Sequence, residues 1–389
     1  MSGVAPEHPQ IFAARADAYN RISDFIVRTY KSKRWGGLVL VAEYGNGKTH
    51  TLKLIRDQIN LELGKTPEGD TLAIYVENLG QDLVNFYFEI LREVGLSLIV
   101  AMLWKIFLQR IGKKLTRNFV EKLRPSQIPL TAPKTEDLPR FFASNSLLKT
   151  AIERGYFSKV LVFDLISNEL KEIIPDHDLR KSCCILLIES DEEIVDLSWR
   201  YFSGRTLTSA QTNKIGVSKS AIKEEDVQRE AFQIVLNIFR AASVVNVYLL
   251  IDEIEDLMPL PRQRKRYVLG GLRSIIENNQ DNFAMFLATT EVGWRDLDAN
   301  SPPLADRFPN LVNLPPLNLE QTKELIEGYL SMAREKEVKD PLFPFSDKLV
   351  EKIWEASGGN LRKILETCYQ LLENGSSKKV ITLTMSLIT

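Results

Sequence analysis

One segment near the N-terminus has the residue types and the spacing of a loop that binds phosphate. It matches the P-loop pattern, with alanine in place of the first glycine, in Ala42-Glu43-Tyr44-Gly45-Asn46-Gly47-Lys48-Thr49, which is followed by His50. The glycines let backbone N–H groups turn toward an anion, and the following helix would direct its positive end at the same anion. Lys48 is expected to reach the β- and γ-phosphates and Thr49 to ligate Mg²⁺. The segment therefore predicts a site for ATP and Mg²⁺.

A second segment, residues 247–253, is an apolar strand that ends in two carboxylates, Asp252 and Glu253. A parallel α/β sheet has its ligand crevice at the carboxyl ends of its strands, so we interpret this segment as a Walker B motif. Asp252 would hold Mg²⁺ through water and Glu253 would polarise the attacking water, because phosphoryl transfer needs charge neutralisation and an oriented nucleophile. The alternative is a buried strand followed by a solvated acidic turn.

A third segment, residues 286–291, is an apolar run that ends in two hydroxyl side chains, Thr289 and Thr290, before Glu291. A hydroxyl at this place could hydrogen-bond the attacking water or the γ-phosphate. The alternative is an ordinary strand end.

The elements that must position these residues alternate between strand and helix. Apolar runs predict strands at residues 38–41, 72–76, 245–251 and 283–289. Helical spacing predicts helices at about 9–30, 49–61 and 83–94. The alternation predicts an α/β fold with a parallel sheet flanked by helices.

The middle and the end of the chain are expected to be mostly helical. Residues 96–108 are apolar but are interrupted by Lys105 and too short to span a membrane, so they predict a buried helix. The middle should also contain a proline-containing stretch at 125–139, a β-like run at 160–163 and a mobile surface loop at 203–220. The predicted units are a core segment with the P-loop at 1–95, a helical insertion at 96–243, the rest of the core at 244–316 and a helical lid at 317–389.

The charge balance limits where nucleic acid could bind. Lysine and arginine total 50 against 51 acidic residues in 389, so any surface for nucleic acid must be local. One local basic segment follows the Walker B motif and contains Arg262, Arg264, Lys265 and Arg266, with Tyr267 beside them for stacking. A second lies at 110–124. A solvated charged face is the alternative for both.

The cysteines and the N-terminus bear on the cellular setting. Cys183, Cys184 and Cys368 lack the spacing of a zinc site, and the adjacent pair is poorly placed for a mutual disulfide. The first residues lack the apolar core of a signal peptide. We therefore expect a cytoplasmic protein with no membrane partner.

The order of the motifs resembles that of AAA+ ATPases. After the P-loop, the Asp-Glu pair and the Thr-Thr pair come Leu304-Ala305-Asp306-Arg307-Phe308 and Gly358-Gly359-Asn360-Leu361-Arg362. The last segment and the helix with Arg15-Ala16-Asp17 resemble Cdc6/Orc-like archaeal and bacterial ATPases. The region from Trp199 to Phe239 also resembles the ATP-binding family of BREX phage-defence systems. Cdc6/Orc proteins carry a C-terminal winged-helix DNA reader, whereas this chain stops at Thr389, soon after the expected lid.

The AAA+ resemblance implies roles for three further residues. Thr290 would be sensor 1, Arg362 sensor 2, and Arg307 an arginine finger that reaches the nucleotide of a neighbouring subunit. A homo-oligomer with nucleotide sites between subunits follows from that role. The alternatives are an intramolecular ion pair of Arg307 with Asp306 or Glu291, and a plain surface charge at Arg362.

The leading hypothesis is therefore an oligomeric AAA+ ATPase that acts as a switch or motor on DNA, in anti-phage defence, mobile-element control or replication. A second hypothesis is a protein-directed switch that controls an effector subunit without DNA. A third is a degenerate ATPase with a structural role, against which the intact Lys48, Thr49, Asp252 and Glu253 argue.

Overall fold

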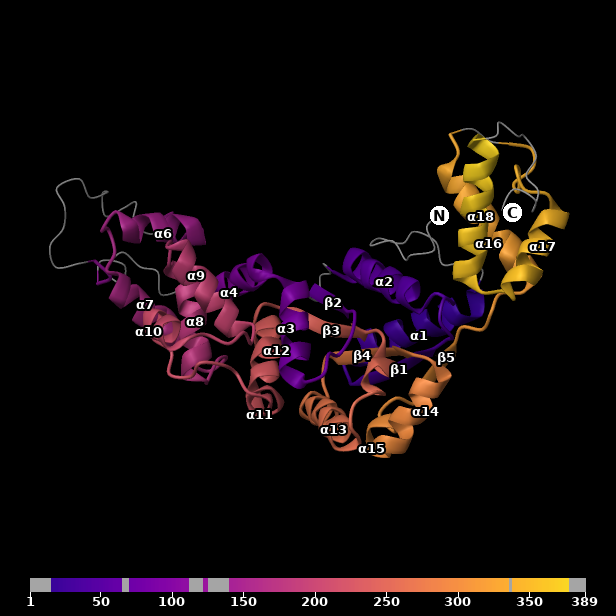
Figure 1. Ribbon diagram of the computed structural model, residues 1–389. Coiled ribbons are helices and arrows are strands. Elements are labelled where there is room, and N and C mark those ends of the chain that lie inside the picture. Colours follow the sequence, from indigo (N-terminus) through magenta and orange to yellow (C-terminus); the bar gives the residue numbers. More distant parts are fainter. Residues whose placement is uncertain (1–14, 65–69, 112–121, 125–139, 336–337, 378–389) are drawn as a thin grey trace.

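A five-stranded parallel sheet forms the centre of the molecule (Figure 1). The computed structural model describes residues 15–64, 70–111, 122–124, 140–335 and 338–377. The strands follow the order β2-β3-β4-β1-β5 across the sheet. They are β1 (Gly36–Val41), β2 (Asp70–Val76), β3 (Val244–Ile251), β4 (Phe283–Thr289) and β5 (Asn310–Asn313). The four predicted strands are confirmed, and β5 is an additional edge strand.

Each central strand buries both of its faces, as continuous apolar runs in parallel sheets do. Every residue of β1 and β4 is buried. Leu38 and Leu40 of β1 belong to one hydrophobic cluster, whereas Val39 and Val41 belong to another on the opposite face. This alternation follows from the two-residue period of a strand.

Helices cover both faces of the sheet (Figure 1). The first cluster contains residues from α1 (Ala16–Ser32) and α2 (Lys48–Gln58), which continues as a π-helical turn at Ile59–Leu63. The opposite cluster contains residues from α3 (Leu83–Val94), α12 (Phe232–Ala241), α13 (Arg262–Asn278), α14 (Glu291–Asn300) and α15 (Pro302–Ala305). The predicted helix at about 9–30 is confirmed from Ala16 onward, and its first part lies outside the described residues.

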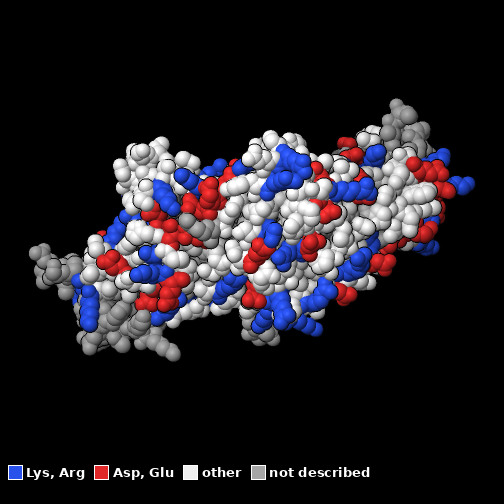
Figure 2. Space-filling view, turned by 90° about the horizontal axis from the view of Figure 1, so that it is seen from below, with Lys and Arg blue, Asp and Glu red and all other residues white. Residues whose placement is uncertain are grey.

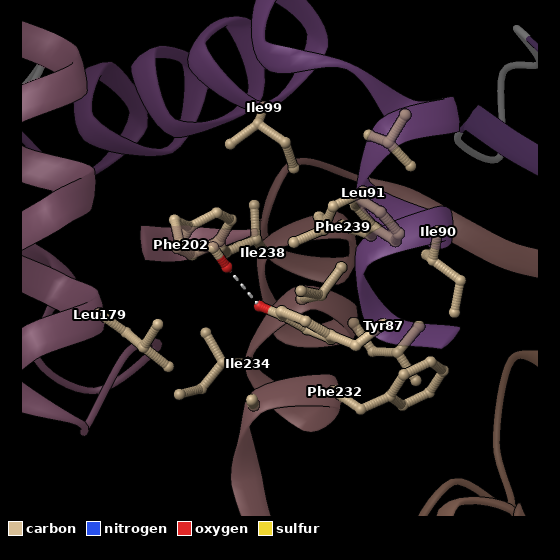
Figure 3. Packing of buried hydrophobic residues seen from close by; sticks show 14 of the residues in the cluster. Tyr87, Ile90, Leu91, Ile99, Leu179, Phe202, Phe232, Ile234, Ile238 and Phe239 are labelled. Atoms are coloured by element: carbon tan, nitrogen blue, oxygen red, sulfur yellow. Dashed lines mark hydrogen bonds between the residues drawn. The ribbon is translucent and has the colours of Figure 1, made fainter. Parts of the chain in front are cut away.

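The middle of the chain forms a helical lobe beside β2 and β3 (Figure 1). Its elements are α4 (Leu96–Ile111), α6 (Asn145–Glu153), α7 (Lys159–Leu170), α8 (His177–Ile188), α9 (Glu192–Phe202), α10 (Ser209–Ile215), α11 (Glu224–Asp226) and a π-helical turn at Val227–Ala231. The lobe has no separate core, because its apolar residues join the cluster on one face of the sheet. Figure 3 shows the junction, where Tyr87 of α3 donates a 3.0 Å hydrogen bond to the carbonyl of Phe202.

The predicted β-like run at 160–163 is wrong, because these residues lie in helix α7. The Ser158 hydroxyl accepts a hydrogen bond from the Leu161 N–H and caps the first turn. Val162, Ile166 and Leu170 then bury one face at a spacing of four residues. A short apolar run cannot separate helix from strand, and the helical period is visible only over the longer segment.

The predicted mobile loop at 203–220 is also wrong. Thr208 and Gln211 form a capping box that starts α10, and Gly216 ends it with a φ of 67°. The buried Asp178 carboxylate then accepts hydrogen bonds from the Ser218 N–H, the Ser218 hydroxyl and the Lys219 N–H. Side-chain caps and one buried acceptor thus order a segment that lacks apolar periodicity.

Three helices after β5 form a small unit with its own core. They are α16 (Leu319–Ala333), α17 (Asp347–Ser357) and α18 (Leu361–Ser377), as the helical pattern at 319–372 predicts. We call this unit the lid. Within the described residues, no helix has both the length and the apolar composition that a membrane crossing requires. The three cysteines are free and buried.

Two of our sequence-based expectations lie mainly outside the described residues. The proline-containing stretch at 125–139 is one of them. The basic stretch at 110–124 is the other, since its Lys113, Lys114 and Arg117 belong to 112–121.

Candidate nucleotide-binding site

The P-loop connects the end of β1 to the start of α2, at the carboxyl edge of the sheet. Gly45 and Gly47 have φ values of 80° and 86°, a conformation that side chains other than glycine rarely adopt. The backbone therefore requires glycine at both positions of the motif. Helix α2 begins directly at Lys48, so its N-terminal end faces the loop.

A cavity lies between this loop and the lid. Most of the predicted nucleotide-binding residues line it, as do the predicted catalytic residues Glu253 and Arg362. The predicted set that lines the cavity is Glu43, Tyr44, Gly45, Gly47, Lys48, Thr49, His50, Glu253 and Arg362. Asn46 is instead buried, 2% exposed, and does not line this cavity. Asp252 lies just beyond the lining, in contact with Thr49.

Three groups contact the ammonium group of Lys48. Its Nζ donates a 3.0 Å hydrogen bond to the Ala42 carbonyl and lies 3.4 Å from Glu255 Oε1. It also lies 4.9 Å from the centre of the Tyr44 ring, within the range of a cation–π contact. The lysine is thus positioned at the bottom of the loop, where a phosphate would meet it.

Thr49, in the first turn of α2, and Asp252, directly after β3, lie in contact. The Thr49 hydroxyl donates a 2.6 Å hydrogen bond to Asp252 Oδ2, and the Tyr75 hydroxyl donates a 3.2 Å bond to the same oxygen. Burial raises the pKa of Asp252 above its usual value, although the Thr49 hydrogen bond favours the ionised form. A hydroxyl and a carboxylate so close together are the oxygen ligands that Mg²⁺ prefers.

Glu253 follows Asp252 in an unusual backbone conformation. Its φ is 48°, which lies in the left-handed region and is uncommon for a residue with a side chain. Burial, and then the negative charge of Asp252, raises the pKa of the Glu253 carboxyl above its usual value. The strained conformation and the shifted pKa are typical of functional positions.

The lid donates hydrogen bonds to two backbone carbonyls of the P-loop. The Arg362 N–H donates a 2.9 Å hydrogen bond to the Gly45 carbonyl, and Asn360 Nδ2 donates a 2.8 Å bond to the Tyr44 carbonyl. Tyr329, Leu361 and Leu365 of the lid add an apolar wall to the cavity, which suits the flat face of a nucleotide base. The sequence patterns did not single out Tyr329 and Leu365, because nothing local distinguishes them from core positions, whereas Leu361 belongs to the Gly-Gly-Asn-Leu-Arg segment noted in the sequence.

Arg15 is a further residue whose contacts we did not predict. Its guanidinium is buried and donates to the Asn46 carbonyl at 2.6 Å and to the Pro315 carbonyl at 2.7 Å. Burial lowers its pKa to about 10, so it stays charged at neutral pH. One side chain thus joins the P-loop to the linker that leads to the lid.

Arg15→Ala is expected to weaken ATP binding by about tenfold, because the loop loses a charge-assisted hydrogen bond that holds its backbone. Arg21→Ala is the matched control, since Arg21 on the same helix also donates to a backbone carbonyl, that of Leu311, but is exposed. Calorimetric titration with ATP in the presence of Mg²⁺ measures both. Equal affinities for the two variants would contradict a role of Arg15 in the loop.

Thr290 is not among the described residues that line the cavity. Its hydroxyl accepts a 3.1 Å hydrogen bond from the Gly293 N–H and caps α14. Thr289, one residue earlier, is fully buried, and its hydroxyl has no hydrogen-bond partner among the described residues. Gly293 packs closely against both Thr289 and Glu255. A Cβ built on Gly293 would lie 2.4 Å from the Thr289 hydroxyl and 2.9 Å from Glu255 Cβ.

Arg307 lies at the amino ends of the strands, whereas the P-loop lies at their carboxyl ends. It precedes β5, and its carbonyl accepts a 3.3 Å hydrogen bond from Trp35, just before β1. Its Nη2 pairs with Glu277 Oε1 of α13 at 2.9 Å, and not with Asp306 or Glu291 as our alternative expected. The side chain therefore cannot reach the nucleotide site of its own chain.

The basic segment after β3 forms the first turns of α13. Lys265 is buried and pairs with Asp296 at 2.7 Å, and Arg264 pairs with Glu224. Lys265 is thus buried in an ion pair and does not form part of the exposed basic surface that we expected, whereas Arg264 is partly exposed and Arg262 and Arg266 are exposed. Figure 2 shows the face of the molecule seen from below, where basic and acidic residues are interspersed over the described part.

The sheet order, the P-loop after β1 and the paired carboxylates after β3 give the chain an AAA+ P-loop fold. A solved structure with this architecture is that of the Aeropyrum pernix ORC2 protein in ADPNP–ADP complexes, with a TM-score of 0.50 and 10% identity over 98% of this chain and 68% of that chain. The ADP form of the same protein matches with a TM-score of 0.50 and 10% identity over 99% and 69% of the two chains. The chain therefore has the fold of the Cdc6/Orc-like AAA+ ATPases.

A similarity in sequence covers a smaller region. A Methanocaldococcus jannaschii protein described as an uncharacterized HTH-type transcriptional regulator is 33% identical over 89 residues. The match covers 23% of this chain and 22% of that relative, so the chain spans about a fifth of the relative's length. No family model matches the chain.

Proposed function

We propose that this protein binds ATP with Mg²⁺, hydrolyses it, and works as an oligomeric AAA+ switch or motor on DNA. The observation that carries the proposal is the single cavity where the P-loop, Lys48, Glu253 and the lid residue Arg362 meet. Nucleotide binding needs the loop, and hydrolysis needs an oriented water and charge neutralisation. We keep the four predicted segments, with bounds at 95, 243 and 316, as the units of this proposal.

Mg²⁺ would be held by Thr49 and Asp252, whose oxygens lie 2.6 Å apart. The metal supplies charge neutralisation of the β- and γ-phosphates when bound. Glu253 would accept a proton from the attacking water, and its raised pKa makes it a better base than an exposed glutamate. Lys48 and Arg362 would bind the phosphates, and Thr289 or Thr290 would orient the water from the neighbouring strand.

DNA as the target is supported by the two exposed arginines at the start of α13, Arg262 and Arg266. The description of the matched relative as an HTH-type transcriptional regulator agrees with a DNA-linked role. The alternative is a switch that controls an effector subunit without binding DNA. The interspersed charges on the face in Figure 2 and the burial of Lys265 in an ion pair favour that alternative.

Glu253→Gln is expected to lower ATP turnover by about 100-fold while ATP binding persists, because the variant keeps the side chain's size but loses the base. The trapped ATP should hold the oligomer together. Turnover and size distribution are measured together, with and without double-stranded and single-stranded DNA. Glu291→Gln, the same change at an exposed position after the neighbouring strand, is the control and should turn over as the wild type does.

The outcomes separate the two proposed functions. Stimulation of turnover by DNA supports the DNA-linked switch. A wild-type protein that hydrolyses ATP at the same rate with and without DNA supports the effector-directed switch. A wild-type protein that binds no ATP would overturn both.

A further inference from the structure

Glu255 is a buried carboxylate that faces the candidate nucleotide site and has no role in the proposed mechanism. It lies in a short 3-10 turn at Ile254–Leu257, directly after Glu253. It is 5% exposed and lines the cavity. Neither of its oxygens has a hydrogen-bond partner among the described residues. A buried carboxylate without hydrogen bonds is costly, so its position needs an explanation.

Lys48 is the group that compensates this charge. Its Nζ lies 3.4 Å from Glu255 Oε1, and the two side chains are 8% and 3% exposed. Lys48 meets two other groups, the Ala42 carbonyl and the Tyr44 ring, and neither carries a formal charge. Asp252 is the other buried carboxylate nearby, but it already accepts hydrogen bonds from Thr49 and Tyr75. Glu255 is therefore the carboxylate that most needs Lys48.

The same ammonium group is the one that a P-loop uses for the β- and γ-phosphates. A carboxylate and a phosphate carry the same sign, so they compete for a single buried lysine. Gly293 packs closely against Glu255, since a Cβ built on Gly293 would lie 2.9 Å from Glu255 Cβ. Glu255 also lines the cavity, where the phosphates would enter.

We propose that Glu255 holds Lys48 in the nucleotide-free protein and gives it up to the triphosphate, which makes Glu255 a positioning residue that limits the affinity for ATP. This inference rests on the proposed function, because it needs ATP in the cavity. In the free protein the ion pair keeps the lysine oriented toward the loop. When ATP enters, its phosphates replace the carboxylate as the partner of Lys48.

The test compares Glu255→Gln with Asp256→Asn. Both remove one carboxylate from the same turn, but Asp256 is exposed, so it reports the general effect of one negative charge less. We expect Glu255→Gln to bind a non-hydrolysable ATP analogue at least about tenfold more tightly than Asp256→Asn does, by calorimetric titration with Mg²⁺. We also expect the nucleotide-free Glu255→Gln protein to have the lower Tm, because Lys48 stays buried without a counter-charge.

Affinity for the analogue distinguishes failure of this inference from failure of the proposed function. If Glu255→Gln binds the analogue no more tightly than Asp256→Asn, Glu255 is a structural partner and the inference fails while the proposed function stands. If the wild-type protein binds no nucleotide, the proposed function fails and the inference with it. Should Glu255→Gln not fold, Glu255→Asp keeps the charge on a shorter side chain, and tighter binding is again expected. Unchanged binding of that variant would contradict the inference.

Discussion

Replacing Lys48 with alanine is expected to remove detectable ATP binding, a loss of about 4 kcal/mol or roughly 1000-fold in affinity. Lys48 is the one lysine among the described residues that line the cavity, and it is buried. Inside a protein the attraction between an ammonium group and a triphosphate is much stronger than in water. Without the lysine the phosphates would lie beside Glu253 and Glu255 with less compensation of their charge.

Calorimetric titration with ATP and Mg²⁺ measures this loss. Lys31→Ala is the control, because Lys31 lies exposed in the last turn of α1, away from the cavity. It should bind ATP as the wild type does. Thermal unfolding without nucleotide checks that the Lys48→Ala protein is folded. A folded Lys48→Ala protein with nearly wild-type affinity would place the nucleotide site elsewhere.

Replacing Arg307 with alanine is expected to lower ATP turnover by about 1000-fold or more with little change in ATP affinity. Arg307 lies at the sheet edge opposite the P-loop, so its guanidinium could stabilise transition-state charge only in a neighbouring subunit. The pair with Glu277 is exposed and therefore weak enough to be exchanged for a phosphate. The loss should thus appear in turnover and not in binding.

Arg273→Ala is the matched control for this variant, because Arg273 contacts the same Glu277 oxygen at 2.8 Å. It should keep its turnover if the Glu277 pair itself is unimportant. Mixing experiments add a second measurement. Inactive Arg307→Ala and inactive Lys48→Ala proteins should regain activity when mixed, since an intact Arg307 from one can complete the intact P-loop of the other. Wild-type turnover by Arg307→Ala alone would exclude a finger at this position.

Local sequence signals were sufficient to predict four of the five strands and to locate the P-loop. Four apolar runs predicted β1 to β4 because buried parallel strands leave a continuous pattern. The P-loop was also visible in the sequence, because its backbone adopts positive φ values at Gly45 and Gly47 and so needs glycine there. The prediction of a β-like run at 160–163 was wrong because four apolar residues fit a strand or a helix equally well. Only the later Ile166 and Leu170 show the helical period.

Contacts between distant segments could not be predicted in the same way. Arg15 meets the Pro315 carbonyl, and Glu255 meets Lys48, only because the sheet brings their elements to one edge. The ion pair of Lys265 with Asp296 is another such contact. Because of it, Lys265 is buried and does not contribute to the basic surface that we expected. Side-chain types alone do not reveal which charges a fold has already paired.

The shared core between the helical lobe and the sheet determines how the lobe can be studied. Because the lobe's apolar residues and those of one sheet face form one cluster, excising residues 96–243 would remove α12 together with the lobe and expose apolar residues of that cluster to water. The lobe is therefore packed into the same core as the sheet and is not a detachable unit. Its biological task has to be dissected with surface substitutions, and a shortened chain that loses activity would report on folding alone.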